Sequence, residues 1–175
     1  MRVWDPFVRV LHWTLVASVA AAWFTREGWG RWHEWIGYAT LAVVLLRIVW
    51  GFAGPRFARF GAFVRKPTSV WAYAAAALRG RAPRHLGHNP LGGWMIVALV
   101  ANVVLVTSSG WLYTTDAFWG VAWVGETHDV LAKSLLVLVA LHVLGVVATS
   151  LAHRENLAAS MIHGRKRAAD PRDVA

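Results

Sequence analysis

Four histidines lie inside strongly apolar stretches of this chain, at His12, His33, His128 and His142. His128 and His142 share one predicted helix, so their rings return to within about 40° of the same face and lie about 21 Å apart along the axis. A polar ring in lipid costs free energy unless it has a partner, so an intramembrane histidine indicates a functional site. Two stacked histidines on one helix, with one histidine on each of two others, can hold two haems between pairs of imidazoles. Haems stacked in this way would carry electrons across a membrane.

The elements that position these histidines are predicted to be membrane helices. The chain has 175 residues, 57% of them hydrophobic, and a mean hydropathy of +0.44, which is too apolar for a soluble domain of this size. A membrane helix needs about 20 mostly apolar residues, and four segments qualify: 7–24, 35–53, 91–112 and 130–151. We therefore predict an all-α integral membrane protein, with a four-helix bundle over residues 1–153 and a basic cytoplasmic tail over residues 154–175.

The loop over residues 54–90 is the longest polar stretch between these segments. A Pro-Thr-Ser run at 67–69 resembles a helix start, and the apolar, alanine-rich run at 70–78 continues it. We expect a short amphipathic helix on the membrane surface, because the run is too short to span. The tail is expected to be partly disordered. The remaining polar-segment histidines are expected to face solvent or lipid headgroups: His85, His88 and His163.

The positive charges lie mainly on one side of the predicted membrane. The formal net charge is +9, and 14 of the 18 lysines and arginines fall near the first helix start, in the long loop or in the tail. The positive-inside rule then places both termini and the long loop in the cytoplasm. Nucleic-acid binding is not favoured, because these charges flank helices and are explained by topology and anionic lipid headgroups.

Helix direction sorts the histidines by depth into two pairs. His33 and His128 lie at the outer end, and His12 and His142 lie towards the cytoplasm. Each pair could supply both axial ligands of one haem b, which leaves no open iron position and favours electron transfer over oxygen chemistry. His153 lies near the same face as His142 and could replace it. We prefer His142, because His153 falls in a polar run at the interface.

Three cations lie close enough to these histidines to meet haem propionates. Arg47 lies on the ligand face of its helix at the inner level, Lys133 lies just over one turn below His128, and Arg9 precedes His12 by three residues. A cation inside the membrane needs an anion or an acceptor, and propionates would supply one. The alternative for Arg47 and Lys133 is snorkelling to lipid headgroups.

Structural or zinc-binding roles for the four histidines are disfavoured. A single intramembrane histidine is often a structural hydrogen-bonding group, but four at two matched depths are not readily explained in that way. A zinc site is disfavoured because the four are split between two levels and no clustered carboxylate joins them. The chain has no cysteine, which excludes iron–sulfur clusters, thiolate-bound haem, covalently attached c-type haem and disulfides.

Four stretches carry a resemblance to a known family. They are Val3-Trp4-Asp5-Pro6 with Arg9 and His12-Trp13; His33-Glu34-Trp35-Ile36-Gly37; Gly87-His88-Asn89-Pro90-Leu91-Gly92; and the run from His128 through His142 to His153-Arg154-Glu155-Asn156 and Gly164-Arg165-Lys166-Arg167. Over nearly its whole length the chain resembles the bacterial cytochrome b561 family, a di-haem, four-helix group related to the b-type subunits of nickel–iron hydrogenases. The resemblance implies an integral membrane protein with two b haems, and the family's ligand pattern falls on His12, His33, His128 and His142.

The resemblance implies electron transfer between membrane quinones and a periplasmic partner such as a c-type cytochrome. Ubiquinone or menaquinone would be the quinone substrate, and the inner end near Arg9 and Arg47 is a candidate quinone site. The alternatives are a superoxide:ubiquinone oxidoreductase and a haem-bearing membrane anchor of a hydrogenase or dehydrogenase. An acidic outer rim would repel superoxide and attract a cationic protein, which favours the electron carrier. The rim consists of Glu27, Glu34, Asp116, Glu126 and Asp129 against Arg26 and Arg31.

Overall fold

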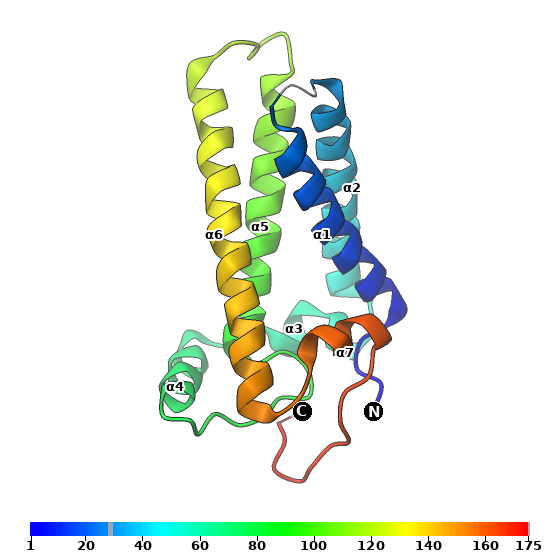
Figure 1. Cartoon of the computed structure of the whole chain (residues 1–175), viewed down its shortest axis with the longest axis vertical. Helices are drawn as coiled ribbons and strands as arrows, with labels where there is room; N and C mark the ends of the chain where they lie inside the picture. The colour runs from blue at the N-terminus through cyan, green and yellow to red at the C-terminus, as the bar shows by residue number, and fades with distance from the viewer. Residues whose placement is uncertain (28–29, 175) are drawn as a thin grey trace. The chain divides into compact units, whose positions relative to one another are not determined.

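The computed structural model describes residues 1–27 and 30–174, and all four predicted membrane segments are helices (Figure 1). Each of the four is long and apolar enough to cross a membrane. Residues 28–29 of the predicted bundle and residue 175 of the predicted tail lie outside the described residues. The helices are α1 (Pro6–Thr25), α2 (Arg31–Ala53), α5 (Pro90–Tyr113) and α6 (Ala122–His153). The chain is therefore an all-helical membrane protein.

The long loop holds three shorter helices, which are η1 (Arg56–Ala58), α3 (Phe60–Phe63) and α4 (Pro67–Leu78). The predicted short helix is confirmed as α4, which begins with proline in its first turn, where the missing N–H costs no hydrogen bond. Trp71 and Leu78 on α4 are 76% and 91% exposed. Large apolar side chains left bare in this way support the predicted place of α4 on a membrane surface.

The tail contains a helix that was not predicted from the sequence, α7 (Leu157–His163). Asn156 caps it, because its side chain accepts a hydrogen bond of 2.9 Å from the amide of Ala159. Gly164 ends it with a φ of 79°, a left-handed conformation that glycine adopts without steric cost. This part of the tail is therefore helical.

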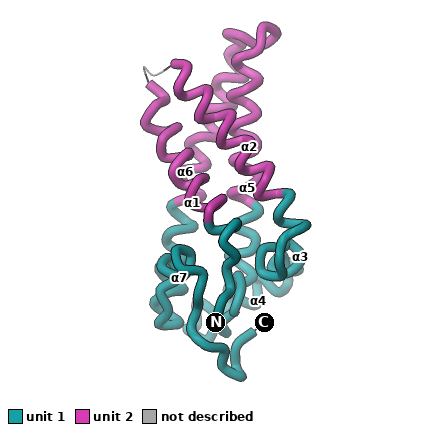
Figure 2. Tube along the Cα trace, turned by 90° about the vertical axis from the view of Figure 1, so that its right-hand side faces the viewer, with its two compact units in different colours: residues 1–9, 49–97, 140–175 teal, residues 10–48, 98–139 magenta. Residues whose placement is uncertain are grey.

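The chain forms two compact units (Figure 2). Unit 1 comprises Met1–Arg9, Val49–Val97 and Ala140–Ala175, and unit 2 comprises Val10–Ile48 and Ala98–Val139. Unit 2 holds portions of all four long helices around an apolar core. Its buried members are Val44, Val103, Val106 and Leu135.

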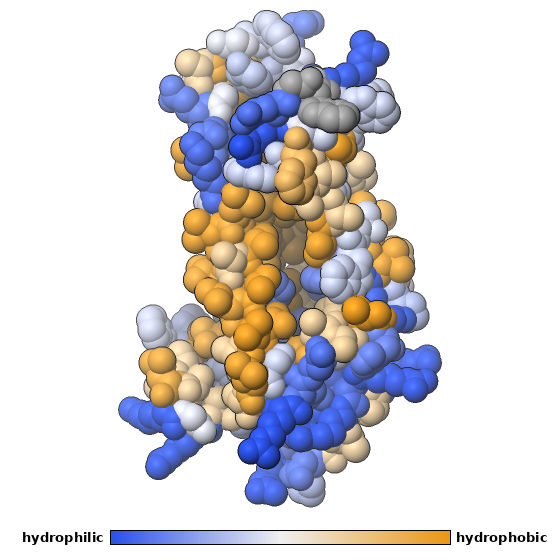
Figure 3. Space-filling view, viewed as in Figure 1, coloured by the Kyte–Doolittle hydropathy of each residue, from blue (hydrophilic) through white to orange (hydrophobic). Residues whose placement is uncertain are grey.

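Polar contacts tie the helices of unit 2 together. Asn102 on α5 donates a 2.8 Å hydrogen bond to the hydroxyl of Ser134 on α6, and the Tyr38 hydroxyl on α2 lies 3.1 Å from that of Thr114. Such bonds between membrane helices are worth about 0.6–2 kcal/mol each. The outward faces remain apolar, as Figure 3 shows for the orange side chains along α6, which suits a lipid solvent.

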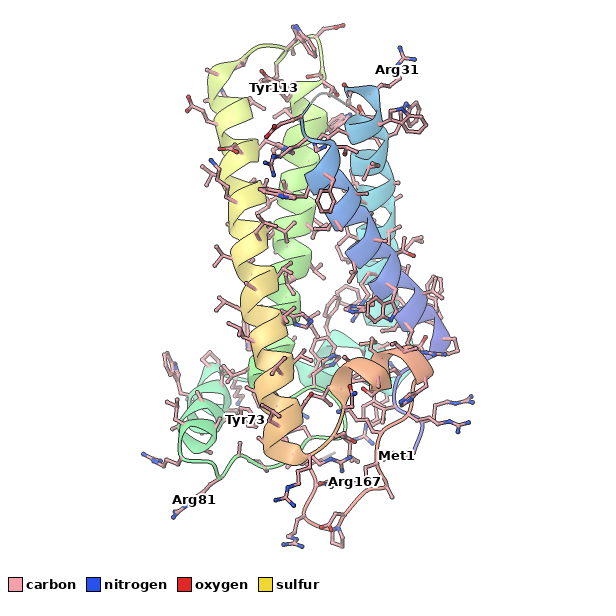
Figure 4. The ribbon with its side chains drawn as sticks, viewed as in Figure 1. Met1, Arg31, Tyr73, Arg81, Tyr113 and Arg167 are labelled. Atoms are coloured by element: carbon pink, nitrogen blue, oxygen red, sulfur yellow. The ribbon has the colours of Figure 1, made fainter. Side chains whose placement is uncertain are left out.

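In unit 1 the first residues of the chain pair with the residues that follow α7. Arg2 and Arg165 form an antiparallel bridge, and the Met1 ammonium donates a 2.7 Å hydrogen bond to the carbonyl of Lys166. Figure 4 shows Met1 and Arg167 at the same end of this unit. Trp4 is 5% exposed, and its indole N–H donates to the Ser160 hydroxyl at 3.2 Å.

A buried ion cluster joins the tail to the long loop. Arg84 lies 2.8 Å from a carboxylate oxygen of Glu155 and also pairs with Asp173. Burial by itself raises the pKa of Glu155, but hydrogen bonds from Arg84 and from the Arg167 amide, with nearby positive charges, hold it below its usual value. Burial also lowers the pKa of the Lys166 ammonium to about 8. The described tail is thus packed into unit 1.

Candidate functional site

His33 on α2 and His128 on α6 lie together in unit 2. Their ring centroids are 6.1 Å apart and the ring planes are at 85° to each other. His33 lies in the first turn of α2, which begins at Arg31, and His128 lies in the second turn of α6. The structure therefore brings together the two histidines that were paired by depth at the outer level.

The two rings share one hydrogen-bonding arrangement. Nδ1 of His33 lies 3.0 Å from the carbonyl oxygen of Ala22, and Nδ1 of His128 lies 2.9 Å from that of Val106. A carbonyl oxygen can only accept, so Nδ1 carries the proton in both rings and donates it. The remaining nitrogen, Nε2, then has a lone pair that can bind a metal, which is the usual arrangement of metal-ligating histidines.

The donor set of this site fits a haem. With 6.1 Å between their centroids, the two rings are close enough for both Nε2 atoms to bind one metal ion. Within residues 1–27 and 30–174, no three His, Cys, Asp or Glu side chains converge as a metal cluster. Two imidazoles would be enough as protein ligands for haem iron, because the porphyrin brings its own four nitrogens. His33 and His128 would then hold the haem.

Residues of α5 form the wall behind the His128 ring, and they were not predicted from the sequence. The Ser109 hydroxyl lies 3.3 Å from Nδ1 of His128. A Cβ placed on Gly110 would lie 2.9 Å from Cε1 of the same ring and 3.1 Å from Nδ1. Figure 4 shows Arg31, where α2 begins, and Tyr113, where α5 ends, at one end of unit 2. Glycine at 110 therefore lets the ring approach α5 and reach its carbonyl acceptor.

The predicted inner pair is divided between the two units, since His12 belongs to unit 2 and His142 to unit 1. Each is half-buried on its own long helix, and the His12 ring packs edge-on against Trp13 at 5.2 Å. Their pairing stays a prediction, as does the alternative role of His153, which is half-buried at the end of α6.

The three predicted propionate partners have different surroundings. Arg47 is 7% exposed on α2. Arg9 donates a hydrogen bond from Nη1 to the carbonyl of Ile162 at the end of α7. Lys133 is 67% exposed and pairs with Asp129 at 2.5 Å, one turn earlier on α6. Propionate binding by all three stays a prediction, and Lys133 already has a carboxylate partner on its own helix.

The loop histidines are more enclosed than expected. The His88 ring packs between Trp4, at 4.5 Å, and Phe63, at 4.9 Å, and His85 packs against Tyr73 at 5.3 Å. The expectation of a solvent-facing role is wrong for His88, because the N-terminal residues that cover it are distant in sequence. His163 is exposed, as expected.

Comparison with known proteins identifies the family of the chain. The family model of prokaryotic cytochrome b561 matches residues 3–164, which include both units' helices and all four predicted ligand histidines. No curated protein and no solved structure matches the chain. A match over most of the chain establishes membership, so this protein belongs to the prokaryotic cytochrome b561 family, whose members are membrane b-type cytochromes of electron transfer.

Proposed function

We propose that this chain transfers electrons across the bacterial inner membrane, between the quinone pool and a periplasmic redox protein such as a c-type cytochrome. The observation that carries the proposal is the His33–His128 pair, with both Nδ1 atoms facing backbone carbonyls and 6.1 Å between ring centroids. Ligation by two imidazoles leaves no open iron position for oxygen chemistry.

The proposed cofactors are two haem b groups. When bound, each would supply a one-electron iron couple that the side chains themselves lack. His33 and His128 would hold the outer haem, and His12 and His142 the inner one. The carbonyls of Ala22 and Val106 keep the outer rings in the tautomer that ligates, so they fix the orientation of the site.

The exposed charges of unit 2 support a cationic partner at the outer end. Two of its carboxylates are paired with cations, Glu27 with Arg26 at 3.1 Å and Asp129 with Lys133. A net negative end steers a positively charged protein towards it and speeds association at low salt. Among the described residues of unit 2, one exposed cation remains, Arg31, against three further exposed carboxylates: Glu34, Asp116 and Glu126.

The same charges disfavour superoxide as the substrate. Superoxide is an anion, and the one outer-side lysine that could attract it, Lys133, is paired with Asp129 at 2.5 Å. We therefore propose the electron carrier ahead of the superoxide:ubiquinone oxidoreductase and ahead of a hydrogenase or dehydrogenase anchor.

The test is a two-step electron transfer with purified protein in detergent. We expect ubiquinol or menaquinol to reduce the haem, as followed by its absorbance spectrum. A cationic c-type cytochrome should then reoxidise the haem at a rate that falls as ionic strength rises. The double variant E34Q/E126Q should slow reoxidation and weaken its salt dependence, whereas the tail variant D170N should not. Failure of both quinols to reduce the haem would contradict the proposal, and rapid reduction by superoxide would favour the alternative.

A further inference from the structure

A pocket of about 70 Å³ lies in unit 1, and none of its described lining residues belongs to unit 2. The long loop supplies most of its lining, from η1, α3 and the turn after it and from the segment before α5, and Val174 of the tail completes it. Its lining includes Arg56, Phe57, Phe63, Arg65, His85 and His88. We call it the Arg56/Arg65 pocket.

The charge of this pocket is positive. No acidic side chain is among its described lining residues, and among the described residues neither Arg56 nor Arg65 forms an ion pair, unlike Arg84, which takes two carboxylates. The Arg56 guanidinium lies 5.6 Å from the centroid of the Phe57 ring, which also lines the pocket. Two arginines that are always charged favour an anion here.

His85 adds a polar group without adding positive charge. Burial lowers its pKa, the hydrogen bond from Nδ1 to the Pro83 carbonyl acts in the opposite direction, and the nearby charge of Arg65 lowers it further. The ring is therefore neutral at pH 7, and the two arginines supply the positive charge of the pocket.

The pocket is built by close packing. A Cβ on Gly87 would lie 2.9 Å from Cδ1 of Phe57, and a Cβ on Gly93 would lie 2.4 Å from the Phe63 carbonyl. Phe63 is 2% exposed, and its ring contacts that of His88 at 4.9 Å. Glycine at 87 and 93 therefore lets the aromatic rings pack closely at the pocket.

Size and guanidinium chemistry select the kind of anion. A water molecule needs about 10–15 Å³ of such a cavity, so the 70 Å³ of this pocket has room for about five waters, which is enough for one phosphate group. Arginine binds phosphate oxygens through two parallel N–H donors. Phe52 at the end of α2 is 72% exposed and Trp71 on α4 is 76% exposed, so apolar side chains that suit a lipid interface belong to the same unit.

We propose that the Arg56/Arg65 pocket binds a phosphate group, carried either by an anionic phospholipid headgroup or by free phosphate. The two arginines hold the phosphate oxygens, and the aromatic walls exclude larger groups from the pocket. This site is separate from electron transfer and does not depend on the proposed function.

The experiment measures binding of three probes to the purified, haem-loaded protein. They are a short-chain phosphatidylglycerol, the diacylglycerol with the same chains and no phosphate, and inorganic phosphate alone. We expect phosphatidylglycerol to bind and the diacylglycerol to bind at least tenfold more weakly. Binding of inorganic phosphate as well would identify free phosphate as a sufficient ligand, and binding of the phospholipid alone would identify the headgroup as the source.

Matched arginine substitutions locate the site. The double variant R56Q/R65Q should weaken phosphatidylglycerol binding by about tenfold or more per arginine, the size of one charge-assisted hydrogen bond. The double variant R79Q/R81Q removes the same charge from exposed residues of the same loop and should bind as the wild type does. Three results would overturn the proposal: no preference of the wild type for phosphatidylglycerol over diacylglycerol, undiminished binding by R56Q/R65Q, or an equal loss in R79Q/R81Q.

Discussion

Replacing Gly110 by alanine should displace the His128 ring and weaken the outer haem site. The added Cβ would lie 2.9 Å from Cε1 and 3.1 Å from Nδ1 of that ring, where ordinary contacts are 3.4–4 Å. The ring must therefore move away from α5 by about half an ångström or more. That movement stretches the 2.9 Å hydrogen bond from Nδ1 to the Val106 carbonyl, which orients the ligating nitrogen.

The size of the effect follows from the cost of overpacking. Inserting a methyl group into a close-packed site costs about 1–3 kcal/mol. If the cost falls on the haem-bound state, haem affinity decreases by about five- to 150-fold. Alanine also has a better helix propensity than glycine by about 1 kcal/mol, so the helix itself is expected to remain intact.

The assay is haem b per chain, with the reduced-minus-oxidised spectrum and the midpoint potentials. G110A should lose part or all of one haem, or shift the potential of one haem only. G61A is the matched control, because a Cβ on Gly61 in α3 would have nothing within 4 Å. Wild-type haem content, spectrum and potentials in G110A would refute the steric role assigned to Gly110.

Three further predictions concern the inner level and the tail. H142A should remove one haem per chain while H153A retains both; the opposite result would make His153 the inner ligand. R84M leaves the Glu155 carboxylate, which is 7% exposed, without its cation. Tail docking should therefore weaken by about 3–5 kcal/mol, and proteolysis of the tail should accelerate. An unchanged cleavage rate would contradict this. The Lys166 pKa is about 8 when the tail is docked and 10.5 when the side chain is exposed. Between these pH values Lys166 has lost its proton in the docked tail but keeps it in the undocked tail. Docking therefore strengthens as pH rises, by up to about 3 kcal/mol. Tail proteolysis should slow over this range relative to K166M, and a constant ratio of the two rates would exclude the effect.

The membrane helices could be predicted because hydropathy averages over about 20 residues. Their ends were less accurate, since α2 begins at Arg31 and α6 at Ala122, several residues before the predicted starts at 35 and 130. The turns that precede the apolar segments contain charged and polar side chains. They hold His33 and His128, which were nevertheless assigned to these helices. Polar residues at helix ends lower the local hydropathy while the backbone stays helical.

The histidine pair could be predicted from depth, but the groups that orient it could not. The Val106 carbonyl and Gly110 meet His128 only because of the rotation of α5 about its axis, which an apolar helix does not reveal in its sequence. The Lys133–Asp129 pair was predictable, because the two residues are four apart on one helix. For α7, an asparagine followed eight residues later by a glycine marks both of its ends.

Contacts between distant parts of the chain account for the rest. Trp4 donates to Ser160, 156 residues away, and Arg84 reaches Glu155 across 71 residues. No local pattern reports such pairings, so the basic composition alone predicted a partly disordered tail. Three of its charged side chains, Glu155, Lys166 and Asp173, are instead buried within unit 1. Lys166 also donates to the His85 and Gly87 carbonyls.

The most direct test of the central claim is the haem b content per chain of the wild type, H128A and H163A. His163 is an exposed tail histidine and serves as the matched control. The His33–His128 assignment predicts two haems in the wild type and in H163A, and one in H128A, with one component lost from the redox titration. Equal haem content and identical redox titrations in all three proteins would contradict it.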